Sequence, residues 1–244
     1  MIEVTGLSKR FGSVVALRDL SFDAPDGQIT GLLGPNGAGK TTALRILYTL
    51  MRPDSGRASV DGIDVAVQPQ AALRRFGVLP DSRGLYDRLT SRENIRYFGR
   101  MHGLAGSQLE ARIDDLITML DMAEIADRRV EGFSQGQRVK VAIARAILHH
   151  PQNIVLDEPT NGLDVLATRA MRTIIRRLRD DGRCVLFSSH IMQEVAALCD
   201  RVVVIAQGAV VATGTPDELR QRTGQESLED AFVAAIGSAE GLMA

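Results

Sequence analysis

The stretch GPNGAGKTT, from Gly34 to Thr42, matches the phosphate-binding pattern G-x-x-x-x-G-K-[ST]. An apolar run, Ile29–Leu33, precedes it, and a run with helical spacing, Lys40–Leu50, follows it. This strand–loop–helix context is the one in which such a loop binds phosphate groups. The sequence therefore predicts a nucleoside triphosphate site here, rather than an accidental glycine-rich turn.

The residue types in this loop account for the expected chemistry. The glycines let the backbone curl so that successive N–H groups point at phosphate oxygens. The helix expected to begin near Lys40 adds the positive end of its dipole to the same site. Lys40 would bridge the β- and γ-phosphates, and the Thr41 hydroxyl would be a ligand of Mg²⁺. The candidate phosphate-binding residues are Gly34, Asn36, Gly37, Ala38, Gly39, Lys40, Thr41 and Thr42.

Length and composition narrow the class of protein. The chain has 244 residues, enough for a substantial core, and a formal net charge of −1, which gives no electrostatic argument for nucleic acid as a partner. Its two cysteines, Cys184 and Cys199, are not accompanied in the sequence by other residues that could form a metal site with them. Such a low cysteine content is typical of proteins in a reducing cytosol. The longest uninterrupted apolar run has six residues (Ala231–Ile236), whereas a membrane span needs roughly 18. We therefore expect a soluble chain.

The N-terminal part predicts a layer of antiparallel strands. Apolar and polar residues alternate in Ile2–Leu7 and Ser13–Phe22, and Arg57–Val67 reads as two short strands around the turn Asp61–Gly62. Phe11 lies between the first two strands. An exposed aromatic ring at this position could stack on adenine, and a place in the core is an equally good interpretation.

The rest of the chain predicts a second, buried sheet and a helical insertion. Besides Ile29–Leu33, apolar runs indicate strands at Phe76–Leu79, Asn153–Leu156 and Cys184–Phe187, and a final hairpin at Arg201–Ala206 and Ala209–Ala212. Helical spacing marks Thr90–Ala126, Thr168–Leu178 and Glu226–Ile236. The pattern predicts an α/β fold with helices inserted between two strands.

Polar residues end two of the buried strands. Asp157 and Glu158 follow the strand at Asn153–Leu156, and His190 follows the strand at Cys184–Phe187. Downstream of a phosphate loop, the first acid can hold Mg²⁺ through water and the second can take a proton from an attacking water. The plainer interpretations are two solvated acids and a structural histidine. The position of His190 at the carboxyl end of a strand favours function.

Another helix follows Phe133–Gln137, which reads FSQGQ. Ser134 is a good N-cap residue, and a capped helix without further function is the simplest interpretation of this stretch alone.

Together these residues resemble the ATP-binding subunits of ABC transporters, over nearly the whole chain. Ser134 lies 23 residues before Asp157 (157 − 134) and His190 lies 32 after Glu158 (190 − 158), both typical of that family. The matches are Phe11 with the adenine-stacking aromatic, Gly34–Thr42 with Walker A, Ile154–Glu158 with Walker B, Phe133–Gln137 with the LSGGQ signature, Asn161–Asp164 with the D-loop, and His190 with the switch histidine.

The resemblance implies an ABC cassette with a RecA-like P-loop NTPase core, the antiparallel layer and a helical subdomain at about 84–150. This single domain would span 1–236, with a tail at 237–244. It also implies an ATPase that uses ATP and Mg²⁺ and pairs head to tail with a second copy or a homologous subunit. The implied catalytic residues are Glu158, His190 and Lys40; the metal site is Thr41, Asp81 and Asp157; and Phe11, Ser134, Gly136, Gln137 and Asp164 add to the nucleotide site.

Asp81 departs from the family pattern. In the loop after Leu79 the family places a glutamine that reaches the metal and the membrane partner, whereas this chain has Asp81. A carboxylate can hold Mg²⁺ or its water at least as well as an amide. The alternative is that Asp81 is a turn residue after Pro80 and faces solvent.

The wording FSQGQRVKVAIARA and the segment Ser227–Phe232 are similar to the ATPases of type-2 exporters, and most of all to NatA-type subunits, which are associated with sodium export. This likeness implies separate transmembrane permease chains, a peripheral place on the cytoplasmic side of the plasma membrane, and no nucleic-acid partner. Two alternatives remain: an ATPase of another ABC exporter or importer, and a non-transport ABC ATPase. Importers carry the glutamine that Asp81 replaces, and non-transport members usually have fused cassettes, coiled coils or basic patches.

Overall fold

A computed structural model describes residues 1–81 and 84–241. Six strands form a central sheet in which all neighbours are parallel except the edge pair β10 and β9. The strands follow the order β10 (Ala209–Gly214), β9 (Arg201–Ala206), β3 (Ile29–Leu33), β8 (Cys184–Ser189), β7 (Asn153–Asp157) and β6 (Phe76–Leu79). The sheet confirms all the buried strands predicted from apolar runs.

The central strands are buried along their whole length, and this explains their continuous apolar runs. Every residue of β3, β7 and β8 is buried, as expected when both faces of a parallel sheet are covered. Alternate residues face opposite sides: Leu156 and Phe187 belong to one apolar cluster, Val155 and Leu186 to the other. The parallel direction brings the carboxyl ends of these strands to one edge.

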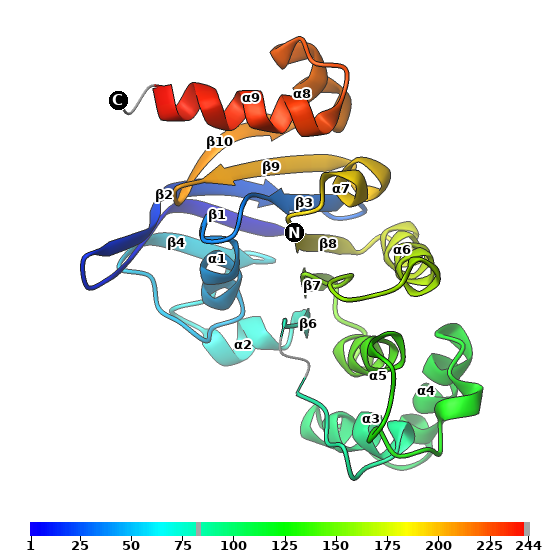
Figure 1. Cartoon of the computed structure of the whole chain (residues 1–244). Helices are drawn as coiled ribbons and strands as arrows, with labels where there is room; N and C mark the ends of the chain where they lie inside the picture. Colours follow the sequence, from blue (N-terminus) through cyan, green and yellow to red (C-terminus); the bar gives the residue numbers. More distant parts are fainter. Residues whose placement is uncertain (82–83, 242–244) are drawn as a thin grey trace.

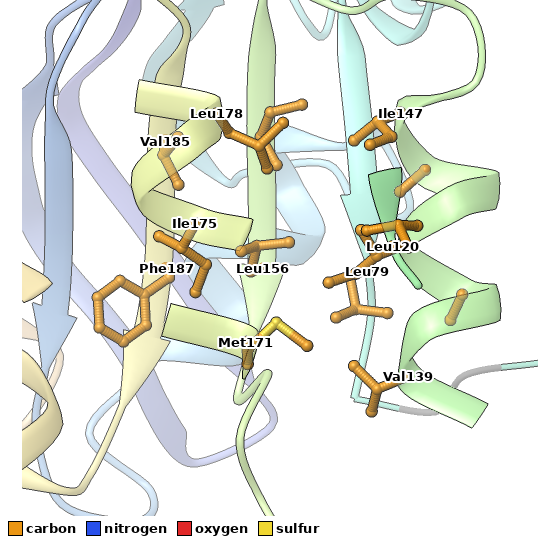
Figure 2. Packing of buried hydrophobic residues seen from close by; sticks show 14 of the residues in the cluster. Leu79, Leu120, Val139, Ile147, Leu156, Met171, Ile175, Leu178, Val185 and Phe187 are labelled. Atoms are coloured by element: carbon orange, nitrogen blue, oxygen red, sulfur yellow. The ribbon is translucent and has the colours of Figure 1, made fainter. Parts of the chain in front are cut away.

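Helices pack against one face of the sheet. In Figure 2 the strand side chains face those of α6 (Val165–Asp180) and α5 (Gln135–Ile147). Residues of this cluster shown there include Leu79, Leu156, Val185 and Phe187 from strands, Met171, Ile175 and Leu178 from α6, and Val139 and Ile147 from α5. The apolar residues that recur at helical spacing in α5 and α6 are therefore the ones that pack against the sheet.

A second, antiparallel sheet covers the opposite face (Figure 1). Its order is β2 (Val14–Ala24), β1 (Ile2–Phe11), β4 (Ser55–Val60) and β5 (Ile63–Asp64), and helix α1 (Lys40–Leu47) packs within the same apolar cluster. The predicted antiparallel layer is confirmed. Phe11, the last residue of β1, is 47% exposed, so the interpretation that it is part of the core is wrong.

Between β6 and β7 the chain is helical, as the sequence predicted. Figure 1 shows α3 (Ser91–Met101), α4 (Gly106–Met119) and α5 gathered beside the β6 edge of the central sheet, with the short 3₁₀ turn Ala123–Ile125 preceding α5. Thr90 caps α3 by accepting from the Glu93 N–H, while the Glu93 side chain accepts from the Thr90 N–H. The domain boundaries predicted here, at about 84–150 and at 236, stay predictions.

Several helices differ from the sequence prediction. Three short ones were not predicted: α2 (Pro69–Leu73), α7 (Met192–Leu198) and α8 (Pro216–Thr223). Helix α6 begins at Val165, earlier than the predicted Thr168, because Asp164 caps it by accepting from the Ala167 N–H. Helix α9 (Leu228–Gly241) lies over β10 in Figure 1 and runs beyond the predicted end at Ile236. None of the helices in the described residues is long and apolar enough to cross a membrane.

Candidate functional site

A cavity of about 350 Å³ lies at the carboxyl edge of the central sheet, where the phosphate loop leaves β3. It gathers most of the predicted site residues from segments far apart in the sequence. The predicted residues that line it are Asn36, Gly37, Ala38, Gly39, Lys40, Thr41, Thr42, Asp81, Glu158 and His190. Val14, Val15, Ala16, Pro35 and Asn161 complete the lining, and the sequence had not marked them as site residues.

The loop has the backbone shape that its glycines allow. Gly37 and Gly39 have φ of 84° and 107°, in the region that side chains disfavour. Gly39 is also the N-cap of α1, and a Cβ there would lie 2.6 Å from the Ala16 carbonyl oxygen of β2. The glycine therefore lets the loop pass close to the antiparallel sheet and turn into the helix.

Lys40 is buried at the start of α1, with its ammonium group at the cavity. Nζ donates to the carbonyl oxygens of Gly34 at 2.7 Å and Pro35 at 3.3 Å, and lies 3.7 Å from Glu158 Oε1. Burial lowers the pKa of Lys40, and the negative charges of Glu158 and Asp157 act against this shift. Gly34 thus acts by holding the lysine and is not itself a lining residue.

Asp157, at the end of β7, is a buried carboxylate with one unsatisfied oxygen. Its Oδ1 accepts from the Ser188 hydroxyl at 2.6 Å and lies 3.5 Å from the Thr41 hydroxyl, whereas Oδ2 is buried without a hydrogen-bond partner among the described residues. Burial raises the pKa of Asp157; the charges of Glu158 and Asp81 raise it further, and the hydrogen bonds from Ser188 and Thr41 oppose the shift. The carboxylate therefore needs a positive partner.

This donor set fits Mg²⁺ bound together with a triphosphate. Mg²⁺ prefers oxygen ligands and usually combines one or two carboxylates with substrate phosphates. The Thr41 hydroxyl and the free Oδ2 of Asp157 are oxygen donors of that kind. Among the described residues there is no group of three His, Cys, Asp or Glu that could hold a metal ion.

The Glu158 carboxylate lies between the side chains of His190 and Lys40. Its Oε2 is 2.9 Å from His190 Nδ1, and its Oε1 faces Lys40. Its backbone has a positive φ of 50°, which is strained for a residue with a side chain, and its N–H donates to the Ser188 hydroxyl at 3.0 Å. The strained turn thus lies where Glu158 lines the cavity and contacts both His190 and Lys40.

Ser188 is a site residue that the sequence reasoning missed. Its hydroxyl donates to Asp157 and accepts from the Glu158 N–H, because β7 and β8 pair in the register Asp157 to Ser188. A polar pair, Ser188 and Ser189, at the end of an apolar strand was the available signal. Its partner could not be identified without the register.

Asp81 is exposed and lines the cavity. Its charge contributes to the raised pKa of Asp157, so the two carboxylates lie close enough to interact. The metal-site role of Asp81 and the alternative that it is only a turn residue in solvent both stay predictions, because Asp81 is exposed and also lines the cavity.

The predicted signature residues lie apart from this cavity. Ser134 caps α5 by accepting from the Gln137 N–H at 3.2 Å, and the Gln137 side chain accepts from the Ser134 N–H at 3.0 Å. Ser134, Gly136 and Gln137 line a smaller cavity of about 180 Å³, together with Ala167 and Met171 of α6. Phe11 and Asp164 are also outside the lining of the phosphate-loop cavity. None of these five residues lines the phosphate-loop cavity within one chain, although Phe11 pairs with Val14, which does.

Comparison with known proteins connects this site to one family. The family model described as ABC transporter matches residues 17–161. The chain is 44% identical over 241 residues to the ABC transporter ATP-binding protein NatA of Bacillus subtilis, covering 97% of this chain and 98% of NatA.

Solved structures share the whole fold. The structure of an ATP-binding subunit of an ABC transporter superposes with a TM-score of 0.88 and 32% identity, covering 97% of this chain and 99% of that one. The dimeric structure of MJ0796, a bacterial ABC transporter cassette, has a TM-score of 0.79 and 25% identity, covering 88% and 98%. These matches confirm the predicted fold class.

Asp157→Asn should change the pH dependence of stability in the protein without metal or nucleotide. Because the folded pKa of Asp157 is raised above its unfolded value, its contribution to stability is present below the unfolded pKa and is lost as pH rises through the folded pKa. The Asn variant lacks this loss, so its Tm should rise relative to wild type over the pH range above the unfolded pKa of about 4. Thermal unfolding in EDTA measures the difference.

The matched control is Asp115→Asn, an exposed position on α4. It should leave the pH profile of Tm unchanged. A constant Tm difference between Asp157→Asn and wild type across this range would contradict the proposed burial of charge.

Proposed function

The chain belongs to the ABC transporter family of ATP-binding proteins, and on that premise we propose that it hydrolyses ATP to power an exporter. The observation that carries the proposal is the meeting of Lys40, Glu158 and His190 at one cavity formed by the phosphate loop. These residues come from three separate segments of the chain. A general base, a cation and a histidine in contact with that base are what the hydrolysis of a phosphoanhydride needs.

The reaction divides among these side chains as follows. A water molecule attacks the γ-phosphorus, the bond to the oxygen bridging the β- and γ-phosphates breaks, and ADP and phosphate form. Glu158 takes the proton of the attacking water, and His190, 2.9 Å from its Oε2, keeps the carboxylate in place. Lys40 stabilises the charge on the phosphate oxygens. Bound at Thr41 and Asp157, Mg²⁺ would supply further positive charge to the triphosphate.

A head-to-tail pair of subunits would explain why the signature residues lie apart from the phosphate loop. Ser134 and the N-terminal end of α5 would then face the γ-phosphate bound by the partner, adding N–H donors and a helix dipole. Next to Asp164, the side chains of Val165 and Leu166 are 69% and 76% exposed. An apolar pair this exposed supports an interface with a second copy or a homologous subunit.

Exposed aromatic residues on the helical part support docking of separate transmembrane permease subunits. Tyr86 and Tyr97 are 47% and 43% exposed and pack edge to face with centroids 5.1 Å apart, and Met101 is 69% exposed. They adjoin a cavity of about 620 Å³ that Tyr97 and Met101 help to line. Such a permease would place the chain on the cytoplasmic side of the plasma membrane. Sodium is the proposed cargo, on the likeness to NatA-type subunits.

Glu158→Gln should keep ATP binding and lose most turnover. The amide preserves size and hydrogen bonding but cannot accept the proton, and the loss of a general base typically lowers kcat about 10²–10⁴-fold. Phosphate release measures turnover, and a sizing column run with ATP should show accumulated dimers. The control is Glu124→Gln, which makes the same change at an exposed position outside the cavity lining and should keep full activity. An active Glu158→Gln variant would exclude the proposed base.

Ser134→Arg tests whether the signature acts on a partner subunit. Bulk and charge at the start of α5 should abolish cooperative hydrolysis and leave nucleotide binding by the dilute monomer intact, because that site is built from Gly34–Thr42. The substitution also removes a cap, worth about 1 kcal/mol. Thr215→Ala, which removes the equivalent capping box of α8, controls for that loss and should remain active. Equal loss of binding and hydrolysis would instead give Ser134 a role within its own subunit.

Asp81→Gln tests the proposed metal-site residue. Without Mg²⁺, the Asp81 carboxylate should repel the triphosphate, and glutamine should improve metal-free ATP binding by up to about 1 kcal/mol, or roughly fivefold. ATP titration with and without Mg²⁺ measures the effect. Asp87→Asn, on the same loop but outside the cavity lining, should leave metal-free binding unchanged. Identical metal-free affinities for wild type and Asp81→Gln would leave Asp81 as a turn residue.

A further inference from the structure

Outside the cavity lining, a buried polar contact joins the loop after β7, which carries Glu158, to helix α7, which follows His190. The Thr160 hydroxyl donates to Glu194 Oε2, and Arg172 Nη2 lies 4.0 Å from Glu194 Oε1. Thr160 and Glu194 are each only 4% exposed. Arg172 comes from α6, and its Nε is buried without a hydrogen-bond partner among the described residues. The phosphate-loop cavity does not include any of these three residues in its lining.

The contact runs beside the one between Glu158 and His190. Thr160 follows Glu158 by two residues in the loop after β7, and Glu194 follows His190 by four in the segment after β8. The segment after β7 and the segment after β8, which includes α7, are therefore joined twice, once at the cavity by Glu158 and His190 and once outside its lining by Thr160 and Glu194. The contact between Thr160 and Glu194 thus links the same two segments of the chain as the contact between Glu158 and His190.

Glu158 and His190 both lie outside the strands and helices. Glu158 has a strained backbone, with φ of 50°, and His190 is on a short segment between β8 and α7. A strained conformation persists only where the surroundings hold it. A buried carboxylate is also a costly choice for packing alone, because apolar residues of similar volume usually do as well. The position of Glu194 therefore calls for a role beyond filling space.

We propose that Glu194, through Thr160, is a positioning residue that sets the geometry of Glu158 and His190 for hydrolysis. The phosphate loop lies on another segment, so nucleotide binding does not depend on this contact. Loss of the contact between Thr160 and Glu194 lets the segments that follow β7 and β8 move apart. This movement displaces the general base, Glu158, from the attacking water. A displacement of about 1 Å can lower a rate roughly 10²-fold. The inference rests on the proposed ATPase function.

The test compares kcat and KM for ATP in three variants. Thr160→Val, close in size but without the hydroxyl, should lower kcat about 10- to 100-fold and leave KM within about twofold. Thr160→Ser restores the hydroxyl and should restore most of kcat. Glu194→Gln keeps an acceptor oxygen for Thr160, so it should lose less activity than Thr160→Val. Ile175→Val, a buried change elsewhere on α6, is the control for lost packing and should keep kcat.

A double variant, Thr160→Val with Glu194→Leu, separates positioning from folding. Replacing both polar partners by apolar side chains avoids an unpaired buried carboxylate, so this variant should fold. The proposal requires its kcat to remain low while its Tm and its affinity for ATP stay close to wild type. Wild-type kcat in the folded double variant, or an equal change of kcat and KM, would overturn the positioning role of Glu194 and Thr160. Either result would leave the proposed ATPase function standing. A wild-type protein without ATPase activity would overturn the proposed function and the inference with it.

Discussion

The parallel pairing of β3, β8 and β7 is the constraint on which the rest of the site depends. It brings the carboxyl ends of three strands to one edge, where each continues into a chemically active segment. The phosphate loop follows β3, Asp157 and Glu158 end β7, and His190 follows β8. The register between β7 and β8 then sets Ser188 against Asp157. Two layers of apolar packing hold these strands in place, so the polar edge does not have to stabilise the fold.

Opposite charges are crowded at this edge. Lys40 is buried against the loop carbonyls, with Glu158 3.7 Å away, while Asp157 has an unsatisfied buried oxygen and Asp81 adds negative charge nearby. Burial disfavours the charged forms of both Lys40 and Asp157, lowering one pKa and raising the other. A triphosphate with a divalent cation would supply what each lacks, an anion for the lysine and a cation for the carboxylate. The same features that make the site costly would therefore favour that ligand.

The α5 terminus shows how one sequence motif can satisfy two interpretations. Within the chain, Ser134 and Gln137 form a capping box, and this accounts for their local structure completely. The same cap leaves an N-terminal helix end and a serine exposed, at a distance from the phosphate loop of its own chain. The proposed pairing of two subunits uses this exposed end, and the exposed Val165 and Leu166 agree with it.

The sequence by itself determined the phosphate loop, the buried strands, the antiparallel layer, the helical segment and the residues at the strand ends. These features depend on local patterns: glycine spacing, apolar runs and caps. Only the tertiary structure decided that Phe11 is exposed, that Ser188 bonds both Asp157 and the Glu158 backbone, and that Thr160 meets Glu194. The contacts of Ser188 and Thr160 join residues 30 to 34 positions apart, and they exist because neighbouring strands pair in one register. A pairing between distant strands leaves no mark in either strand alone. For this reason the residue patterns could place the two acids at the end of β7, Asp157 and Glu158, but not the contacts that hold them.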